Sequence, residues 1–180
     1  IIKKVINDVK NEKDINITNK ENSCGHGIFT NIETAVDKAY EAQQTYNSRS
    51  LEERRNIISN IRKELLKYTE EMAEKTVAET KMGRIKDKIL KNKLAIEKTP
   101  GVEDLGTEVF TGDDGLTLVE LSAFGVLGSV TPVTNPTETI INNTIGALAG
   151  GNSIVFCPHP SAKNICLWLI KKLNGRSEER

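Results

Sequence analysis

The sequence is poor in aromatic residues, in cysteine and in long apolar runs, and each shortage excludes a class of protein. Aromatic residues make up only 4% of the 180 residues, and the three cysteines, Cys24, Cys157 and Cys166, lack the spacing of metal ligands. They indicate reduced thiols and not a disulfide framework. No apolar run approaches the roughly 20 residues of a membrane span, and no secretory signal is visible. These absences predict a cytoplasmic protein without a metal site or a membrane partner.

Two nucleotide-binding motifs are also absent. The chain contains neither a GxGxxG loop nor a GxxxxGK[ST] sequence, so motif rules alone predict no nucleotide cofactor. The formal net charge is zero. The helical segment from 84 to 98 is rich in lysine but has no interleaved aromatic residues, which favours a solvated helix face over a nucleic-acid surface. The lysines of that segment are Lys86, Lys88, Lys91 and Lys93.

The N-terminal part of the chain divides into a short helix and a linker. Residues 1–10 place their apolar side chains on one stripe, which predicts an amphipathic helix. Residues 11–26 are polar and without periodicity, as expected of a flexible linker. The helix either docks on its own domain or acts as a detachable targeting segment.

Capping patterns predict four helices between residues 30 and 98. Thr30 with Glu33, and Ser50 with Glu53, have the spacing of capping boxes. The first helix should end near residue 46, and two further helices are predicted over 72–80 and 84–98. The residues expected to face the core from the first two helices are Ile32, Val36, Ala39, Tyr40, Ile57, Ile58, Ile61 and Leu65.

Residues 107–122 predict a β-hairpin. Val109-Phe110 and the apolar run 116–121 flank the sequence Thr-Gly-Asp-Asp-Gly at 111–115, which is a strong turn signal.

Residues 124–163 predict a βαβ unit around which the rest of the chain is organised. The runs 126–131 and 152–156 are short, apolar and rich in β-branched residues, as in buried parallel strands. Between them, Asn135 can cap a helix, Pro136 suits its first position and Glu138 has the place of a capping-box acid.

The two ends of this unit also carry signals. Gly150-Gly151 is predicted to end the helix, and Ser161 is predicted to cap a further helix after the second strand. Ligands of parallel α/β sheets bind beyond the carboxyl ends of the strands, which here are residues 131–135 and 157–163. Cys157 and His159 lie close there, but Pro158 separates them and no third orienting group is evident, which argues against a nucleophilic dyad.

Three segments resemble a known family. The sequences TPGVEDLGTEVFTGDDGLTLVE, TPVTNPTETIINN and IVFCPHPSAK are similar to the CoA-acylating aldehyde dehydrogenases, above all to the acetaldehyde and propionaldehyde enzymes of bacterial ethanolamine and propanediol microcompartments. The resemblance covers residues 27–174. It implies an α/β fold, in which a helical N-terminal region and a β-hairpin arm (107–122) lead into the start of a doubly wound, Rossmann-like parallel sheet.

The same resemblance implies that the chain is an N-terminal fragment. Members of the family are more than twice as long and carry the nucleophilic cysteine in a later domain. Residues 27–174 would form the first part of the NAD-binding domain, while residues 175–180 do not continue the pattern and are interpreted as a non-native tail. The fragment by itself is expected to be inactive.

The activity implied by the resemblance is oxidation of a short aldehyde, acetaldehyde or propionaldehyde, with NAD and coenzyme A to acyl-CoA and NADH. The expected assembly is a homo-oligomer (a dimer or a tetramer) in which the hairpin acts as an oligomerisation arm. Residues Ile1–Lys10 would direct it to a microcompartment shell. Two alternatives stay open: a hydrolytic aldehyde dehydrogenase, and a non-catalytic nucleotide-binding or shell-interacting module.

The resemblance also implies roles for residues at the strand ends. Asn135 would donate a hydrogen bond to the oxyanion, although ungapped alignment from Pro136 places Thr134 in that role. Many ordinary family members have a lysine where this chain has Cys157, and its absence agrees with the CoA-acylating group. The residues expected beside the nicotinamide are Thr131, Pro132 and Val133, and those near the adenosine ribose are Cys157, Pro158 and His159.

Overall fold

The computed structural model describes residues 27–174, and the predicted α/β order of elements is confirmed there. The predictions of a targeting helix, a linker and a tail lie outside the described residues. Within residues 27–174, no helix combines the length and the hydropathy that crossing a membrane requires. The same residues hold no cluster of three or more potential metal-ligating side chains.

The first half of the described chain forms the four predicted helices, α2 (Ile32–Tyr46), α3 (Leu51–Leu66), α4 (Thr69–Thr80) and α5 (Ile85–Lys98). The capping box of Ser50 and Glu53 is present at the start of α3. The predicted cap of α2 was wrong by one residue, because Asn31 and not Thr30 caps that helix, with its Oδ1 accepting from the backbone N–H of Glu33 at 2.7 Å. Helix α4 begins one turn earlier than residue 72.

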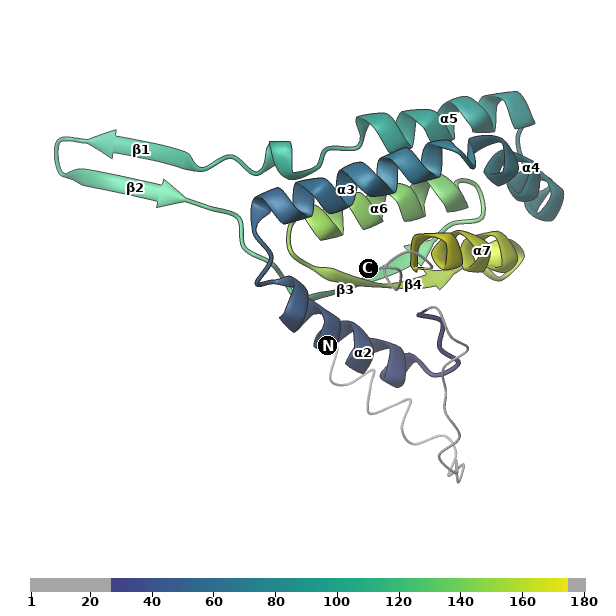
Figure 1. The fold of residues 1–180 in the computed structure, drawn as a ribbon, viewed down its shortest axis with the longest axis horizontal. Coiled ribbons are helices and arrows are strands. Elements are labelled where there is room, and N and C mark those ends of the chain that lie inside the picture. The colour runs from purple at the N-terminus through teal and green to yellow at the C-terminus, as the bar shows by residue number, and fades with distance from the viewer. Residues whose placement is uncertain (1–26, 175–180) are drawn as a thin grey trace, which may run out of the picture.

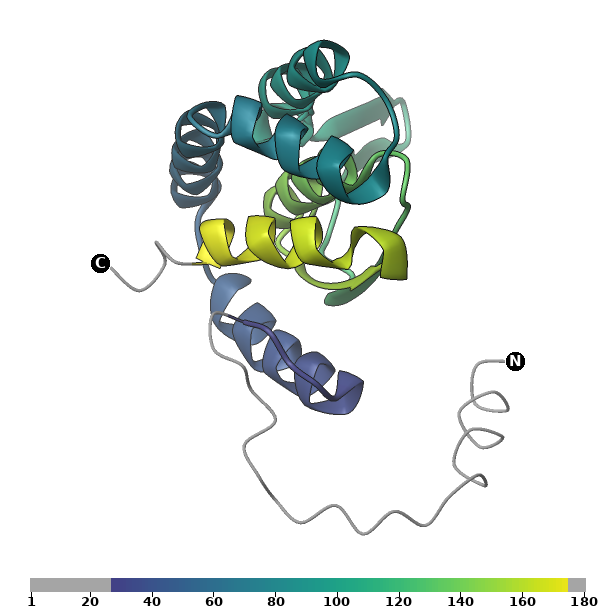
Figure 2. The ribbon, with the colours of Figure 1, turned by 90° about the vertical axis from the view of Figure 1, so that its right-hand side faces the viewer.

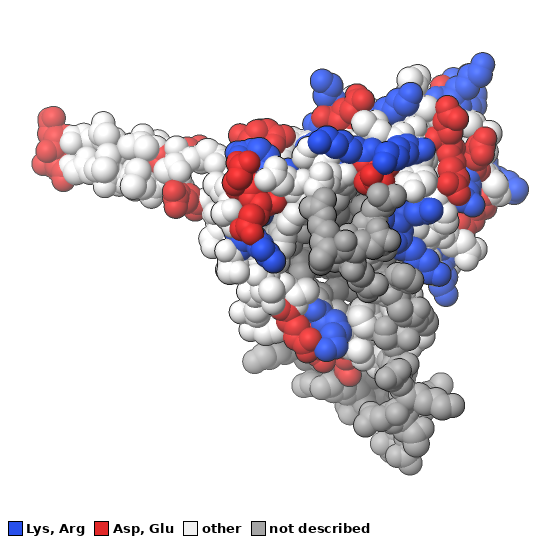
Figure 3. Space-filling model, in the orientation of Figure 1, with Lys and Arg blue, Asp and Glu red and all other residues white. Residues whose placement is uncertain are grey.

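The predicted hairpin consists of β1 (Glu108–Gly112) and β2 (Gly115–Val119), which follow a short 3-10 turn, η1 (Val102–Asp104). It projects away from the helices (Figure 1), and every residue of both strands is exposed. In Figure 3 its surface is nearly uncharged apart from acidic groups at its tip and base. The hairpin therefore contributes nothing to the core of this chain.

The predicted βαβ unit is also confirmed. Strand β3 (Val126–Thr131) pairs in parallel with β4 (Ser153–Pro158), and α6 (Pro136–Ala149) connects them. Gly151, at φ +76°, provides the left-handed residue after α6. A second 3-10 turn, η2 (Pro160–Ala162), leads into α7 (Lys163–Asn174).

The sheet lies between α2 on one face and α6 on the other, and α3, α4, α5 and α7 surround α6 (Figures 1 and 2). The apolar core is centred on α6 and its helical neighbours. Its fully buried residues include Ile140, Ile141 and Ile145 of α6, Met72 of α4, Ile96 of α5 and Leu169 of α7.

Two predictions of burial were wrong. Ile32, Val36 and Tyr40 of α2 are exposed, because α2 meets the βαβ unit through a different face. On that face the Gln43 side chain donates to the backbone carbonyl of Gly151 at 3.2 Å. Strand β3 is also not buried throughout, since Val130 is 83% exposed.

Helix α7 shows a long-range cap in place of the predicted one. The carboxylate of Glu79, at the end of α4, accepts from the backbone N–H groups of Asn164 at 2.9 Å and Ile165 at 2.7 Å. Ser161 instead belongs to η2. Cys166 is fully buried in α7, and burial raises the pKa of its thiol to about 12, which suits a core residue and not a nucleophile.

Candidate functional site

The two segments predicted to bind a ligand meet at one edge of the sheet. The parallel register places Thr131 opposite Pro158, and the backbone N–H of His159 donates to the carbonyl of Thr131 at 3.0 Å. Pro132 and His159 are exposed at this edge, while Val133 and Cys157 are half-buried. The two predicted cofactor segments, 131–133 and 157–159, therefore begin at the same edge of the sheet, although they are far apart along the chain.

The Thr131 side chain stands out at this edge. It is fully buried, and its Oγ1 has no hydrogen-bond partner among the described residues. Most buried hydroxyl groups are hydrogen-bonded, so an unpaired one calls for a partner such as an ordered water or a bound ligand. Thr131 Oγ1 lies at the carboxyl end of β3, and the carboxyl ends of parallel strands are where a nucleotide cofactor binds.

His159 is oriented by its own turn. Its Nδ1 accepts from the backbone N–H of Ser161 at 3.1 Å, so the ring proton of the neutral side chain lies on Nε2. The imidazole thereby offers an exposed N–H donor, the kind of group that can bind a ribose hydroxyl. Among the described residues, no hydrogen bond joins Cys157 to His159, whose Nδ1 is taken up by the Ser161 N–H.

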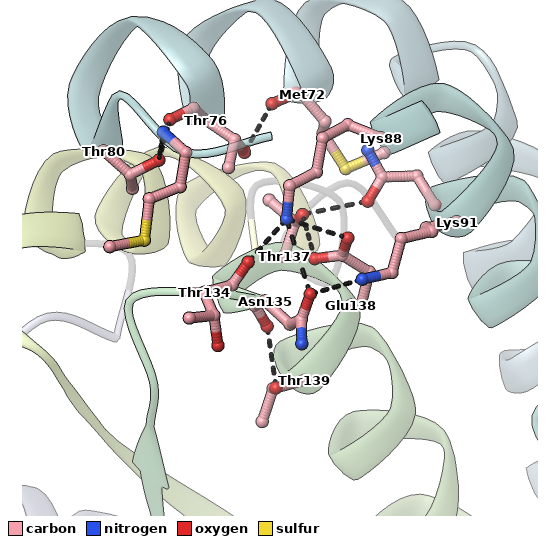
Figure 4. Close-up of polar contacts among 12 residues, drawn as sticks. Met72, Thr76, Thr80, Lys88, Lys91, Thr134, Asn135, Thr137, Glu138 and Thr139 are labelled. Atoms are coloured by element: carbon pink, nitrogen blue, oxygen red, sulfur yellow. Dashed lines mark hydrogen bonds and ion pairs between the residues drawn. The ribbon is translucent and has the colours of Figure 1, made fainter. Parts of the chain in front are cut away.

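The loop between β3 and α6 does not form the predicted cap. Asn135 occupies the N-cap position, but its side chain makes no hydrogen bond to the first turn of α6. Its Oδ1 instead accepts from the Nζ of Lys91 at 2.5 Å, and the Nζ of Lys88 lies 3.5 Å away (Figure 4). Glu138 likewise does not reach back to the N-cap, because its carboxylate is paired with Lys88.

The predicted solvated lysine face of α5 holds for Lys86, Lys91 and Lys93, which are exposed, but it was wrong for Lys88. Its side chain is only 5% exposed, and its Nζ donates to the Thr134 carbonyl at 2.6 Å and to Glu138 Oε1 at 3.3 Å. Helix α5 also exposes two leucines, Leu90 at 67% and Leu94 at 61%, although Ile96 of the same helix is fully buried. Sequence reasoning missed Lys88 because hydrophobic periodicity assigns lysine to the solvent side of a helix.

A buried polar network extends from this ion pair. The hydroxyl of Thr137 donates to Asn92 Oδ1 at 2.9 Å, and its Oγ1 also lies 3.0 Å from Glu138 Oε2. The Asn92 amide in turn reaches the carbonyl of Thr69 at 3.5 Å. Side chains of α5 and α6 and the backbone of α4 thus fix the start of α6 and the loop before it.

The N-terminus of α6 adds partial positive charge at this loop. Of the two ammonium groups beside it, that of Lys88 is paired with the Glu138 carboxylate and that of Lys91 with Asn135 Oδ1. In Figure 4 the amide nitrogen of Asn135 points away from both lysines, and the side chain of Thr134 also points away from them. Thr134 is exposed, and its hydroxyl is the second candidate donor in the loop.

Comparison with known proteins identifies the scaffold of this site. The aldehyde dehydrogenase family matches residues 19–174. Propanal dehydrogenase (CoA-propanoylating) of Salmonella typhimurium is 53% identical over 146 residues, which are 81% of this chain and 32% of that protein. The chain thus spans about a third of the length of this relative.

Solved structures give the same result. Propionaldehyde dehydrogenase of Rhodopseudomonas palustris, with bound CoA and an acylated cysteine, superposes with a TM-score of 0.81 at 49% identity, over 84% of this chain and 35% of that one. A propionaldehyde dehydrogenase from the fucose utilisation bacterial microcompartment of Clostridium phytofermentans superposes with a TM-score of 0.79 at 48% identity, over 83% of this chain and 34% of that one.

Proposed function

Because the chain belongs to the aldehyde dehydrogenase family, we propose that its complete protein oxidises propanal or acetaldehyde to the corresponding acyl-CoA. The carbonyl carbon of the aldehyde would give up its hydrogen as hydride to NAD and form a thioester with the sulfur of CoA, whose thiol proton would go to solvent. NAD supplies the hydride acceptor when bound. The names of the Salmonella and Rhodopseudomonas proteins support this choice of substrate and of CoA over water.

The observation that carries the proposal is the orientation of Asn135. When a thiolate adds to an aldehyde, negative charge develops on the carbonyl oxygen, and a fixed N–H donor there lowers the barrier. Asn135 lies at the carboxyl end of β3 with its amide carbonyl held by lysine, so its N–H groups remain for a ligand. Its failure to cap α6 supports a role in binding over a structural one.

The residues of the sheet edge would hold NAD. Thr131, Pro132 and Val133 would line the nicotinamide side, and Cys157, Pro158 and His159 the ribose side. The outward N–H of His159 and the orphaned hydroxyl of Thr131 support this assignment. The described cysteines do not match the family's nucleophile, so the 180-residue chain alone is expected to give no sustained NADH production.

The direct test uses the protein encoded by the complete reading frame. NADH formation from propanal should require CoA, and mass spectrometry should detect propanoyl-CoA. Formation of propanoate without CoA would instead favour the hydrolytic alternative. Absence of any NADH, from a folded protein that still binds NAD, would favour the non-catalytic module.

Substitutions then separate the two candidate donors. Asn135→Ala should lower kcat by about a hundredfold or more, as expected for loss of an oxyanion donor. Thr134→Ala should have a much smaller effect. The reverse ranking would assign the role to Thr134 and leave the reaction itself unchanged.

We also propose that the hairpin and the N-terminal segment serve assembly. The apolar, projecting strands β1 and β2 suit pairing within a homo-oligomer. Residues 1–10 would direct the protein to a microcompartment shell, which the origin of the Clostridium protein supports. A fluorescent protein fused to residues 1–10 should localise to microcompartments, and Val5→Glu with Val9→Glu should make it diffuse.

A further inference from the structure

We propose that Lys91, assisted by Lys88, is the positioning residue that turns the N–H groups of Asn135 toward the substrate. The inference rests on the proposed function, because it assumes that the Asn135 amide is the oxyanion donor. It adds a cause for the orientation of that amide. The cause lies on α5, a helix that is distant from β3 and α6 in the sequence.

The chemistry of the contact fixes the orientation of the amide. An ammonium group carries hydrogen-bond donors and no acceptor, so only the carbonyl end of an amide can face it. Lys91 Nζ lies 2.5 Å from Asn135 Oδ1 and Lys88 Nζ lies 3.5 Å from it. With the oxygen held by these cations, the nitrogen must point to the opposite side, as Figure 4 shows.

The competing orientation is local and available from the sequence. As an N-cap, Asn135 would direct Oδ1 toward the backbone N–H groups of the first turn of α6. Pro136, at the first helical position, leaves these donors in place, because an N-cap side chain accepts from the second or third position. A charge-assisted hydrogen bond from Lys91 is stronger than a bond from a neutral backbone donor, so the lysine prevails.

Buried contacts between α5 and α6 hold the backbone of Lys91 in place. Lys88, one turn before Lys91 on α5, is buried and bonded to the Thr134 carbonyl and to Glu138. The Asn92–Thr137 hydrogen bond adds a second link between α5 and α6. The distance between Lys91 and the loop is thereby set by buried contacts, although Lys91 itself is exposed.

The first experiment is Lys91→Met in the protein from the complete reading frame, with Lys93→Met as the matched control. Both lysines are exposed on α5, but only Lys91 contacts Asn135. Loss of one charged hydrogen bond to a half-exposed amide should lower kcat/KM for propanal by about fivefold to tenfold. The melting temperature should be unchanged, Lys93→Met should retain full activity, and Lys91→Arg, which keeps a donor, should recover most of the rate.

A double-mutant cycle makes the assignment specific. In an Asn135→Ala background the amide is absent, so Lys91→Met should cause no further loss of kcat/KM. Equal losses in both backgrounds would show that Lys91 acts elsewhere and would overturn the inference. A slow Asn135→Ala with a fully active Lys91→Met would overturn the inference and leave the proposed function intact. A fully active Asn135→Ala would overturn both the donor role of Asn135 and the role of Lys91.

Discussion

The starts of α3 and α6 have the same sequence pattern and different structures. Ser50 and Glu53, like Asn135 and Glu138, combine a good N-cap residue with an acid three positions later. At α3 the reciprocal bonds form, with Glu53 N donating to Ser50 Oγ at 3.2 Å and Ser50 N donating to Glu53 Oε2 at 2.8 Å. At α6 neither bond forms.

The difference lies in what surrounds each helix start. The α3 start is exposed, so its caps compete only with water. The α6 start is packed against α5, and two ammonium groups attract the oxygen atoms that would otherwise cap the helix. At the candidate site, the capping residues of α6 therefore bind lysines of α5. At α3 the capping residues bind each other and serve only the helix start.

The largest expected effect comes from breaking the ion pair at the α6 start. Lys88→Met leaves the buried carboxylate of Glu138 without its cation, which should lower the free energy of unfolding by about 3–5 kcal/mol. Urea denaturation of the full-length protein measures the change. The control Lys86→Met removes an exposed lysine of the same helix and should change stability by less than about 0.5 kcal/mol. Equal effects of the two substitutions would contradict a structural ion pair.

A third helix start gives an intermediate case. The carboxylate of Glu79 on α4 caps the N-terminus of α7 by accepting from its backbone N–H groups. This cap comes from another helix and is charged, as are the lysines at the α6 start. It nevertheless pairs the free N–H groups of the helix, as the Ser50 side chain does at α3. Glu79→Ala should lower the free energy of unfolding by about 1–2 kcal/mol, which thermal unfolding measures. The matched control is Glu74→Ala, which removes an exposed carboxylate from the same helix. A Glu79→Ala variant as stable as this control would show that the long-range cap contributes nothing.

Ser50→Ala and Asn135→Ala compare the two capping residues directly. Loss of the working cap should cost about 1 kcal/mol at α3. At α6 the substitution removes no cap, so the melting temperature should change little while kcat falls by about a hundredfold. A lowered melting temperature with near-normal kcat for Asn135→Ala would show that Asn135 acts as a cap after all.

The smallest effect is a dependence on pH at the α3 start. Hydrogen bonds from Arg49, and then from the Ser50 backbone and side chain, lower the pKa of Glu53 from 4.5 to about 2. Because the folded-state pKa is depressed, the stabilisation is present above pH 4.5 and is lost as the pH falls through about 2. The melting temperatures of the wild type and of Glu53→Gln should therefore converge in that range, and a difference that is constant with pH would contradict this cause.

The sequence by itself determined the order of the elements, the hairpin and the βαβ unit. These features depend on local signals: the apolar runs that form β3 and β4, the turn residues between β1 and β2, and Gly151 after α6. The family resemblance is likewise contained in contiguous segments, and its fold was confirmed. The neighbourhood of Thr131 and His159 was also predictable, because parallel strands bring their carboxyl ends to one edge.

Only the tertiary structure decided which partners the polar side chains of these elements take. Local patterns predict that Lys88 faces solvent and that Asn135 and Ser161 cap helices, and in each case a residue distant in the sequence changes the outcome. Lys88 bonds to the loop before α6, Asn135 accepts from Lys91, and Glu79 caps α7 in place of Ser161. Rules that use only the local sequence consider two hydrogen-bond partners for a polar side chain, namely water and the neighbouring backbone. An ammonium or carboxylate brought in by another helix binds more strongly than either, so the orientation of Asn135 depends on the packing of α5 against α6.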